Sequence, residues 1–387
     1  MKCPICGCHE SEPIYRLCSS MKILGANFPD GETYIVSCLE CGLVYCRTLA
    51  NQQDFLTYYT SVAKSPKYYD MVGAEATRNY FQHILKLIEP YIHTESKILD
   101  IAGAWGELGE YMAKNGYPNV TILDPCEECI LFAKQKGLLT VQTDSTEMGK
   151  VLQERYDLII FNHTLEHILE IREAIENACK LLKDKGHIFI ELPDAEEYAN
   201  QSLPPFTYFT YEHVIHFTVH DIENLSKRYG LEIVGWNKYY KEVSRYPSFY
   251  VILKKNSEIK PITYSTVGKD SIKKYIAECN QQLHQMLEPY EANHEPLILW
   301  GIGASTALLL EAFSQCNVEQ IVDSNPARQG LVFQIGNKKY PIVDPESIRS
   351  SRATIFILPG AYKNSIEKQI RDLGFENNIT SFTMNQM

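Results

Sequence analysis

The stretch KILDIAGAWGELGEYM, residues 97–112, decides the fold of the central part of this 387-residue chain. A short apolar strand, KILDI, brings Asp100 to its end. It runs into AGAWGELGEYM, where Gly103 and Gly106 form the turn before a helix. Glycines in such a turn let a ligand approach the backbone closely. The stretch therefore predicts a strand, a ligand-binding turn and a helix.

Further strands with polar ends follow this unit. They are NVTILD, which ends at Asp124, LLTVQTD, which ends at Asp144, YDLIIFN, which ends at Asn162, and GHIFIELP. Alternation with helical stretches such as EATRNYFQHILKLIEPYI predicts an α/β domain with a parallel sheet over residues 70–256. Such sheets bind ligands at the C-terminal ends of their strands, and a carboxylate after the second strand can accept hydrogen bonds from ribose hydroxyls. Asp124 is the candidate for that role.

The ordered set of Asp100, Gly103, Gly106, Asp124, Asp144 and Asn162 resembles the cofactor site of class I S-adenosylmethionine methyltransferases. The resemblance implies that Asp100 and the glycine turn lie near the methionine moiety and that Asp124 holds the ribose. It also implies that Asp144 faces the adenine amine and that Asn162 follows the fourth strand. The alternative is a Rossmann-like sheet that binds NAD. AGAWGELG does not supply the G-x-G-x-x-G fingerprint, and Trp105 occupies the pyrophosphate approach.

Three polar residues after the fourth strand have two interpretations. His163, Glu166 and His167 in NHTLEHILE have the side-chain types of a metal site. We favour the alternative, in which this segment packs as a helix beside the sheet.

Two cysteine pairs near the N-terminus predict a metal site. Cys3 and Cys6, then Cys38 and Cys41, form two C-x2-C pairs separated by 31 residues, and a glycine follows each pair. Four thiolates with this spacing close a tetrahedral zinc site, which is structural because no coordination position stays open. We therefore expect a zinc-binding domain over residues 1–69, with a hairpin arm over 21–37; a redox role for the pairs is the weaker alternative.

A segment rich in aromatic residues and histidines, NQSLPPFTYFTYEHVIHFTVHDI, follows the strand GHIFIELP. Within six residues it contains Tyr211, Glu212, His213 and His216, which are side chains suited to acid–base chemistry. Methyl transfer to carbon needs a base beside a carbonyl and a donor that stabilises the enolate. His213 is the candidate base and Tyr211 the candidate donor. In the alternative, the aromatic residues pack the loop down and the histidines lie at the surface.

The last third, residues 257–387, repeats the strand, glycine turn, helix and strand order. LILWGIGASTALLLEAF contains Gly301 and Gly303, and VEQIVDSNPARQG brings Asp323 to the end of the next strand. This pattern predicts a second, incomplete Rossmann-like half that binds substrate or nucleotide. The alternative is a structural domain in which the glycines only allow close packing.

The sequence contains, in this order, CPICG with CLECG, the methyltransferase sheet, the loop with Glu212 and His213, and VDSNPARQG with PIVDPESI. This order resembles that of sugar C-methyltransferases that act on nucleotide-linked 4-keto deoxysugars. The resemblance implies that the zinc domain and the sheet enclose the sugar, and that the C-terminal domain holds the nucleotide. It also implies that a His-Glu-His loop supplies the base. Glu212 and His213 match its last two residues, and Tyr211 replaces the first, so that His213 and His216 compete as the base. Tyr58 or Tyr59 in YYTSVAKSP contacts the sugar or serves as a structural aromatic.

Composition narrows the class of partner. The chain has 48 acidic and 37 basic side chains, which opposes a general nucleic-acid or anionic-membrane surface and favours small-molecule chemistry. MKCPICGCHE lacks the order of a secretory signal, and twelve cysteines suit a reducing compartment, so we expect a cytoplasmic protein. The expected function is C-methylation of a nucleotide-linked keto sugar, with S-adenosylmethionine as cofactor and structural Zn²⁺. O-methylation of a sugar or glycan precursor, and a member of the family without catalysis, are the alternatives.

Overall fold

The computed structural model describes residues 1–17, 28–29, 31–61, 68–200, 203–242, 245–256, 258–303 and 306–382. The chain forms two compact units. The first unit comprises residues 1–14, 35–198 and 214–271, and the second comprises residues 15–34, 199–213 and 272–387. The division into three domains expected from the sequence, residues 1–69, 70–256 and 257–387, stays a prediction.

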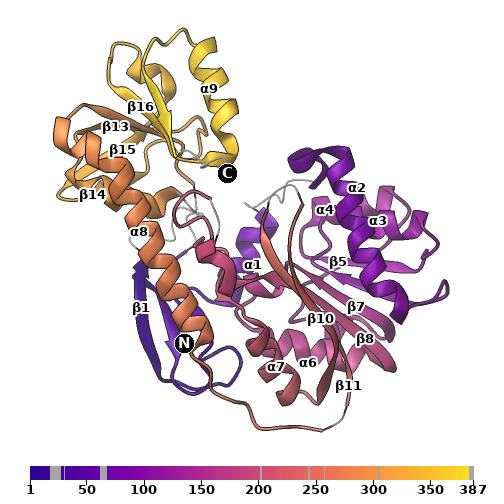
Figure 1. Cartoon of the computed structure of the whole chain (residues 1–387). Helices are drawn as coiled ribbons and strands as arrows, with labels where there is room; N and C mark the ends of the chain where they lie inside the picture. Colours follow the sequence, from indigo (N-terminus) through magenta and orange to yellow (C-terminus); the bar gives the residue numbers. More distant parts are fainter. Residues whose placement is uncertain are drawn as a thin grey trace. The chain divides into compact units, whose positions relative to one another are not determined.

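A seven-stranded sheet forms the centre of the first unit (Figure 1). Its order is β10-β11-β8-β7-β4-β5-β6, and β4 to β8 pair in parallel, whereas β11 is antiparallel to both β8 and β10. The strands are β4 (Ile98–Ile101), β5 (Val120–Asp124), β6 (Leu139–Gln142), β7 (Tyr156–Asn162), β8 (Leu182–Pro193), β10 (Leu231–Tyr240) and β11 (Pro247–Lys255). The prediction of an α/β domain is confirmed, but the sheet is mixed, because β10 and β11 add antiparallel pairings to the parallel strands β4 to β8.

Helices cover both faces of this sheet. Helices α2, α3 and α4 lie on one face, and α6 and α7 lie on the other (Figure 1). Because both faces are covered, the central strands are apolar, and Ile98, Leu99 and Leu158 expose no surface. The helices are α2 (Tyr68–Ile88), α3 (Glu107–Lys114), α4 (Glu127–Gln135), α5 (Met148–Val151), α6 (Ile171–Leu181) and α7 (Val219–Arg228), with 3₁₀ helices η2 (Glu89–Tyr91), η3 (Leu165–His167) and η4 (Ala195–Asn200).

A four-stranded sheet contains the N-terminal strands. Its order is β1-β2-β3-β9, with β1 (Ser11–Leu17), β2 (Thr33–Cys38), β3 (Val44–Arg47) and β9 (Ile215–His216), and helix α1 (Gln52–Ser61) follows β3. Strand β9 belongs to the aromatic segment after β8 and pairs antiparallel with β3, so that Val44 faces His216. Residues 21–27 and 30 of the hairpin arm expected over residues 21–37 lie outside the described residues, and residues 33–37 of the arm belong to β2.

The second unit contains a six-stranded sheet of order β14-β15-β13-β12-β16-β17. It is parallel except for β14, which pairs antiparallel with β15 at one edge. This arrangement agrees with the Rossmann-like second half expected from the sequence. The elements are α8 (Val267–Asn293), β12 (Leu297–Trp300), η5 (Thr306–Gln315), β13 (Val318–Val322), β14 (Val332–Ile335), β15 (Lys338–Val343), η6 (Pro345–Ile348), β16 (Thr354–Ile357), η7 (Gly360–Tyr362), α9 (Lys363–Asp372) and β17 (Ile379–Ser381).

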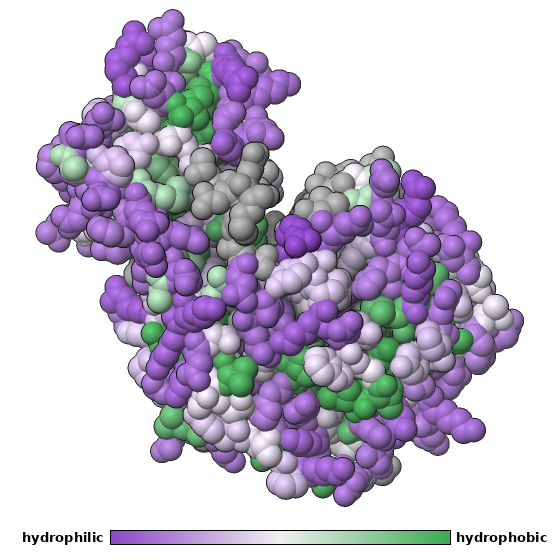
Figure 2. Space-filling view, in the orientation of Figure 1, coloured by the Kyte–Doolittle hydropathy of each residue, from purple (hydrophilic) through white to green (hydrophobic). Residues whose placement is uncertain are grey.

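Hydrophilic residues cover most of the face shown in Figure 2, and hydrophobic residues form small, separate patches on it. Small apolar patches of this kind are ordinary on a folded protein surface. In the part of the chain that the structure describes, no helix has both the length and the apolar character needed to cross a bilayer.

Candidate functional site

The C-terminal ends of the central parallel strands form one polar edge. In the strand register, Ile101 of β4 lies beside Leu123 of β5 and Phe161 of β7. The residues that follow, Asp124 and Asn162, therefore end their strands at the same level, and Asn162 pairs with Glu191 of β8. The edge brings together the polar side chains predicted from the sequence, and Glu191 adds a carboxylate to them.

Asp124 closes the glycine turn after β4. Its Oδ2 accepts a hydrogen bond from the N–H of Ala104 at 3.0 Å, and its Oδ1 accepts one from the N–H of Cys126 at 2.8 Å. The turn is strained, because Ala102 and Ala104 have positive φ angles of 54° and 44°. Gly106, with φ of 66°, begins helix α3. One carboxylate therefore holds both the turn and the start of α4 in place.

Asp100 lies beneath this turn. Its side chain is buried, and burial, together with the nearby charge of Asp124, raises its pKa to about 7. Gly103 leaves no room for a side chain, because an added Cβ would lie 2.8 Å from Asp100 Oδ2. Gly103 also donates its N–H to the Leu123 carbonyl at 3.2 Å. The absence of a side chain at residue 103 thus allows the turn to lie directly against a buried carboxylate.

Asp144 follows the edge strand β6, and Asn162 ends β7, the middle strand of the sheet. Asp144 follows β6, and its Oδ1 accepts the N–H of Thr146 at 2.7 Å, which caps the turn before α5. Asn162 ends β7, and its Oδ1 accepts a hydrogen bond from the Tyr80 hydroxyl at 2.9 Å. That contact orients the Asn162 amide so that its NH₂ group points away from Tyr80.

A buried network of charges continues from Asn162. The Tyr80 hydroxyl lies 3.0 Å from Glu191 Oε1 and accepts a hydrogen bond from Lys241 Nζ at 3.0 Å. Glu191 exposes no surface, and its Oε1 also lies 2.9 Å from His163 Nε2. The other ring nitrogen of His163, Nδ1, lies 3.2 Å from Glu166 Oε1. The network thus links strands β7, β8 and β10 with helix α2.

The charged groups in this network stabilise one another's ionised forms. Burial acts to raise the pKa of Glu191, but the charges of Lys241 and His163 outweigh it and lower the pKa to about 2. Burial and Lys241 act to lower the pKa of His163, but hydrogen bonds to Glu166 and Glu191 raise it above its ordinary value. Glu166 lies buried in the 3₁₀ helix η3, and both Glu166 and His163 also belong to this charge network.

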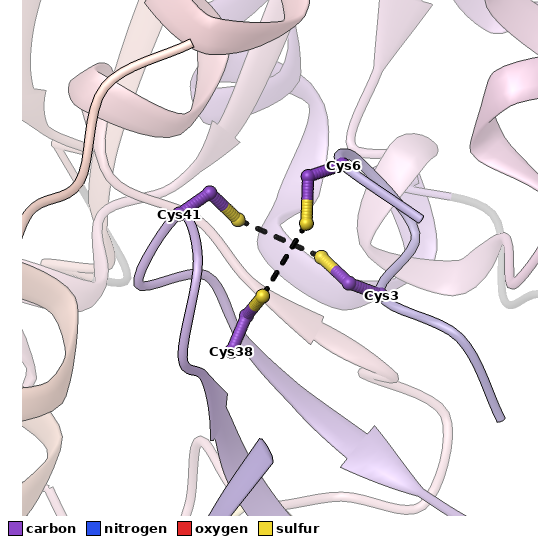
Figure 3. Close-up of side chains that lie close together, drawn as sticks. All are labelled: Cys3, Cys6, Cys38 and Cys41. Atoms are coloured by element: carbon purple, nitrogen blue, oxygen red, sulfur yellow. Dashed lines mark hydrogen bonds between the residues drawn. The ribbon is translucent and has the colours of Figure 1, made fainter. Parts of the chain in front are cut away.

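The four N-terminal cysteine sulfurs point toward one another (Figure 3). They all lie within 4.8 Å of each other, with Cys3 Sγ 3.6 Å from Cys41 Sγ and Cys6 Sγ 3.3 Å from Cys38 Sγ. Ligands of a tetrahedral zinc ion at about 2.3 Å have sulfur–sulfur distances of about 3.8 Å, so only a small expansion is needed. The donor set and its geometry fit a Zn²⁺ ion.

The turns that present these sulfurs have the same construction. Gly7 and Gly42 have φ angles of 82° and 85°, and each donates its N–H to the carbonyl of the cysteine four residues earlier at 3.0 Å. The N–H of the residue two positions after Cys6 and after Cys38 lies 3.4 Å from that sulfur. Gly42 cannot carry a side chain, because a Cβ there would lie 1.8 Å from the Ser265 carbonyl oxygen.

The aromatic segment places its candidate residues differently. Tyr211 is buried, whereas Glu212 and His213 are half-buried, and the His213 N–H donates to the Thr210 carbonyl at 3.2 Å. His216 is fully buried on β9, and burial lowers its pKa to about 3. A histidine with that pKa is a poor proton acceptor near neutral pH. Of the two competing histidines, the structure favours His213.

The remaining candidates lie apart from the edge carboxylates along the chain. Tyr58 is buried in α1, and the hydroxyl of Tyr59 lies 3.2 Å from His167 Nδ1. The rest of the motif that contains these tyrosines, residues 62–67, lies outside the described residues.

In the second unit, the glycine turn after β12 is closed by Asp323. Its Oδ2 accepts the Ile302 N–H at 2.8 Å and lies 3.3 Å from Arg328 Nη1. Gly301 has a φ angle of 95°, and Gly303 donates its N–H to Thr306 Oγ1 at 2.7 Å.

The sequence analysis missed Tyr80, Glu191 and Lys241. Glu191 had a signal, because a charged residue interrupts the apolar strand FIELP shortly before the strand ends. Tyr80 lies in a helix with ordinary amphipathic spacing, and Lys241 follows the exposed edge strand β10. Only the tertiary arrangement brings these two residues to Glu191.

Parts of this chain are similar in sequence to known proteins. Residues 39–235, just over half of the chain, match the family model of a methyltransferase domain. The ubiquinone biosynthesis O-methyltransferase of Histophilus somni is 34% identical over 106 residues, which cover 25% of this chain and 44% of that protein. The corresponding protein of Aliivibrio fischeri is 31% identical over 99 residues, which cover 24% and 42%. The chain thus spans less than half the length of these relatives.

Solved structures of methyltransferases also align with the chain. The N-methyltransferase NodS of Bradyrhizobium japonicum aligns over 47% of this chain and 98% of its own, with 19% identity and a TM-score of 0.37. A methyltransferase of Archaeoglobus fulgidus aligns over 48% and 97%, with 18% identity and a TM-score of 0.40. Because the matching family model covers more than half of the residues, the chain belongs to the methyltransferase-domain family.

Proposed function

We propose that this methyltransferase transfers the methyl group of S-adenosylmethionine to a carbon atom of a nucleotide-linked keto sugar. The observation that supports cofactor binding is the edge at which Asp100, the strained turn of residues 102–106 and Asp124 meet. Asp124 is the acceptor for the ribose hydroxyls, and Asp100 supplies a negative charge for the methionine ammonium group. Asp144 is the partner of the adenine amine, and Asn162 presents its NH₂ group beside the methionine moiety.

Carbon methylation requires a proton to leave the acceptor before the new bond forms. In the proposed reaction His213 takes the proton from the carbon beside the keto group, and the resulting enolate carbon attacks the sulfonium methyl. The methyl–sulfur bond breaks, its electron pair stays on sulfur, and S-adenosylhomocysteine remains. Tyr211 is the proposed donor to the enolate oxygen, and Glu212 lies next to the base in sequence.

The residue that follows His213 is held within the first unit by backbone hydrogen bonds. Val214, the residue after His213, donates its N–H to the Glu166 carbonyl at 2.8 Å and accepts the N–H of Cys46 at 2.8 Å. Since Glu166 follows β7 and Cys46 lies in β3, the chain after His213 is anchored both to the loop after β7 and to the N-terminal sheet. This anchoring supports a functional role for the loop.

A structural zinc ion held by Cys3, Cys6, Cys38 and Cys41 forms part of the proposal. The ion would fix the two glycine turns and so the start of the sheet that includes β3 and β9. In the second unit Gly301, Gly303 and Asp323 are the proposed contacts for the nucleotide of the substrate. Because Arg328 lies beside Asp323, the turn offers a guanidinium group to a phosphate.

O-methylation is the second candidate, because the two relatives described above are ubiquinone biosynthesis O-methyltransferases. In that case His213 would take a proton from a hydroxyl group, and the oxygen would attack the methyl.

The experiment that separates these reactions supplies deuteromethyl S-adenosylmethionine with nucleotide-linked 4-keto and hydroxy sugars. Mass spectrometry detects transfer, and carbon–proton correlation NMR locates the methyl. A methyl on carbon supports the proposal, and a methyl on oxygen selects the second candidate. The Asp124→Asn variant is the control for cofactor dependence. Cofactor binding without transfer to any member of the panel would contradict the sugar assignment.

A further inference from the structure

The imidazole of His163 bridges two carboxylates in the first unit. Nδ1 lies 3.2 Å from Glu166 Oε1, and Nε2 lies 2.9 Å from Glu191 Oε1. The two carboxylates are almost fully buried, with 1% and 0% of their surfaces exposed, whereas the His163 side chain is 20% exposed. Both ring nitrogens are therefore engaged, and both partners are acceptors when ionised.

Elementary hydrogen-bond chemistry fixes the number of protons in this bridge. A neutral imidazole has one N–H, and its other nitrogen carries a lone pair that would repel a carboxylate oxygen. Two short nitrogen–oxygen contacts therefore require two hydrogens. With both carboxylates ionised, the ring between Glu166 and Glu191 must be an imidazolium.

The backbone of His163 supports a role beyond packing. Its φ angle is +50°, which is unfavourable for a residue with a Cβ, and it directly follows the C-terminal end of β7. The strain is held in place because the His163 N–H donates to the Glu191 carbonyl at 2.9 Å. The backbone and the side chain of His163 thus both contact Glu191 of β8.

Each end of the bridge leads to a side chain at the polar edge. Through Glu191 and the Tyr80 hydroxyl, the bridge reaches the amide of Asn162. Through Glu166, it reaches His167, whose Nε2 lies 3.9 Å from Glu166 Oε1. The orientation of two side chains on opposite sides of His163 is therefore coupled through one ring.

We propose that His163 is a positioning residue, which as an imidazolium between Glu166 and Glu191 holds Asn162 and His167 in the arrangement required for methyl transfer. The inference rests on the methyl-transfer part of the proposed function and not on the identity of the acceptor. Removal of the cation leaves two buried carboxylates close together with Lys241 as the nearby countercharge, and the edge must then rearrange.

The groups that face His163 set the direction of its pH dependence. They are Glu166 and His167 from the loop after β7, Glu191 from β8, Lys241 after β10, Tyr80 from α2 and the ring of Tyr246, 6.1 Å away. The carboxylates outweigh Lys241, so the pKa of His163 lies above its ordinary value. The bridge is therefore present at pH values below the ordinary histidine pKa of 6.5 and is lost as pH rises through the raised pKa.

The first test observes the ring directly. Nitrogen-15 NMR of the histidine rings in the full chain distinguishes an imidazolium from either neutral tautomer, and the His163→Asn spectrum assigns the signal. We expect His163 to lose its second ring proton at a pH above the ordinary histidine pKa of 6.5, and Glu191→Gln to lower that pH. A neutral tautomer in the unmodified protein at pH 6.5 would overturn the inference. This measurement needs no acceptor, so it holds even if the sugar assignment fails.

The second test measures turnover with whichever acceptor the deuteromethyl assay identifies. Asn tolerates the positive φ angle, so His163→Asn removes the cation with little added backbone strain. We expect kcat to fall about 10–100-fold, with the KM values of cofactor and acceptor within about threefold of the original, as for a lost transition-state alignment. His163→Lys, which keeps a cation, should recover part of kcat.

A matched histidine in the middle of β8 provides the control. His187 lies on the same strand as Glu191 and packs against Tyr91 with tilted rings whose centroids are 4.7 Å apart, outside the bridge. His187→Asn should leave kcat within about twofold, because it removes packing only. An unchanged kcat in His163→Asn, or an equal loss in His187→Asn, would contradict a positioning role. If His163→Asn does not fold, Glu191→Gln answers the same question.

Discussion

Asp124 and Asp323 close the glycine turns of their two sheets with the same pair of hydrogen bonds. Their Oδ2 atoms accept the N–H of Ala104 at 3.0 Å and of Ile302 at 2.8 Å. Their Oδ1 atoms accept the N–H two residues later in the chain, at 2.8 Å in both cases. They differ in charge balance, because Arg328 lies 3.3 Å from Asp323. The equivalence makes Asp323 a control for Asp124.

Replacing Asp124 by Asn should weaken S-adenosylmethionine binding by about 10–100-fold, since hydrogen bonds to a charged group contribute about 1.5–3 kcal/mol. Isothermal titration calorimetry measures the change. Asp323→Asn perturbs an equivalent turn in the other sheet and should alter cofactor affinity by less than about twofold. Equal losses in the two variants would place the cofactor elsewhere.

Cofactor affinity should rise with pH up to about 7 and then level off. Burial and Asp124 raise the pKa of Asp100 to about 7, and the cationic methionine portion favours its ionised form. Below that pKa, affinity should change about tenfold per pH unit, because binding releases a proton. Calorimetry in buffers of different ionisation enthalpy detects that proton, and Asp100→Asn should abolish its release.

The raised pKa of Asp100 also predicts how the stability of the cofactor-free protein changes with pH. Folded Asp100 keeps its proton up to about pH 7, whereas its ordinary pKa is 3.8. Between pH 3.8 and about 7, the folded state therefore binds more protons than the unfolded state. The contribution of Asp100 to the free energy of unfolding falls as pH rises through this interval. Urea unfolding at pH 5 and pH 7 should show a smaller decrease for Asp100→Asn than for the unmodified chain.

Gly103→Ala should abolish cofactor binding while the sheet still folds. The added methyl carbon would lie 2.8 Å from Asp100 Oδ2 and 3.1 Å from the Ile122 side chain, so the turn must move away from Asp100. Gly268→Ala is the matched control, because its Cβ would have ordinary contacts at 3.5 Å near the start of α8. Equilibrium dialysis measures binding, and circular dichroism reports the fold. Normal binding by Gly103→Ala would contradict the assigned turn.

Cys38→Ser should release zinc and lower the melting temperature by at least about 5 °C, because metal binding contributes folding free energy. Cys8→Ser is the comparison, since Cys8 lies beside the cluster and its sulfur hydrogen-bonds to the backbone of Glu10. Mass spectrometry of the native protein measures metal content. One zinc ion in Cys8→Ser and none in Cys38→Ser is the expected result. Full zinc content in Cys38→Ser would remove the metal assignment.

The sequence was sufficient where function depends on local patterns. The strand ends at Asp124 and Asn162 followed from apolar runs that stop at a polar residue, and the structure has both as the last residues of β5 and β7. The cysteine pairs were visible for the same reason, because two turns of C-x2-C-G have the same local geometry wherever they occur.

Contacts between distant segments could not be predicted in this way. The buried network of charges around Glu191 joins residues of α2, β7, β8 and the end of β10, and no spacing rule connects Tyr80 with Lys241. Likewise, the short strand β9 has only two residues, which is below the length at which alternation can be recognised. His216 therefore looked like a second acid–base candidate, although it pairs with Val44 in a sheet and is buried.

The pairing of Val44 with His216 also constrains how the protein is made. A ribosome that has completed the cysteine turns must add roughly 170 more residues before the partner strand of β3 emerges, at about 5–20 residues per second. For that interval the backbone edge of β3 is open to water or to a chaperone. The four-stranded sheet is thus completed late in synthesis although its first strands are translated first, and a truncated fragment that ends before residue 215 would lack the partner strand of β3.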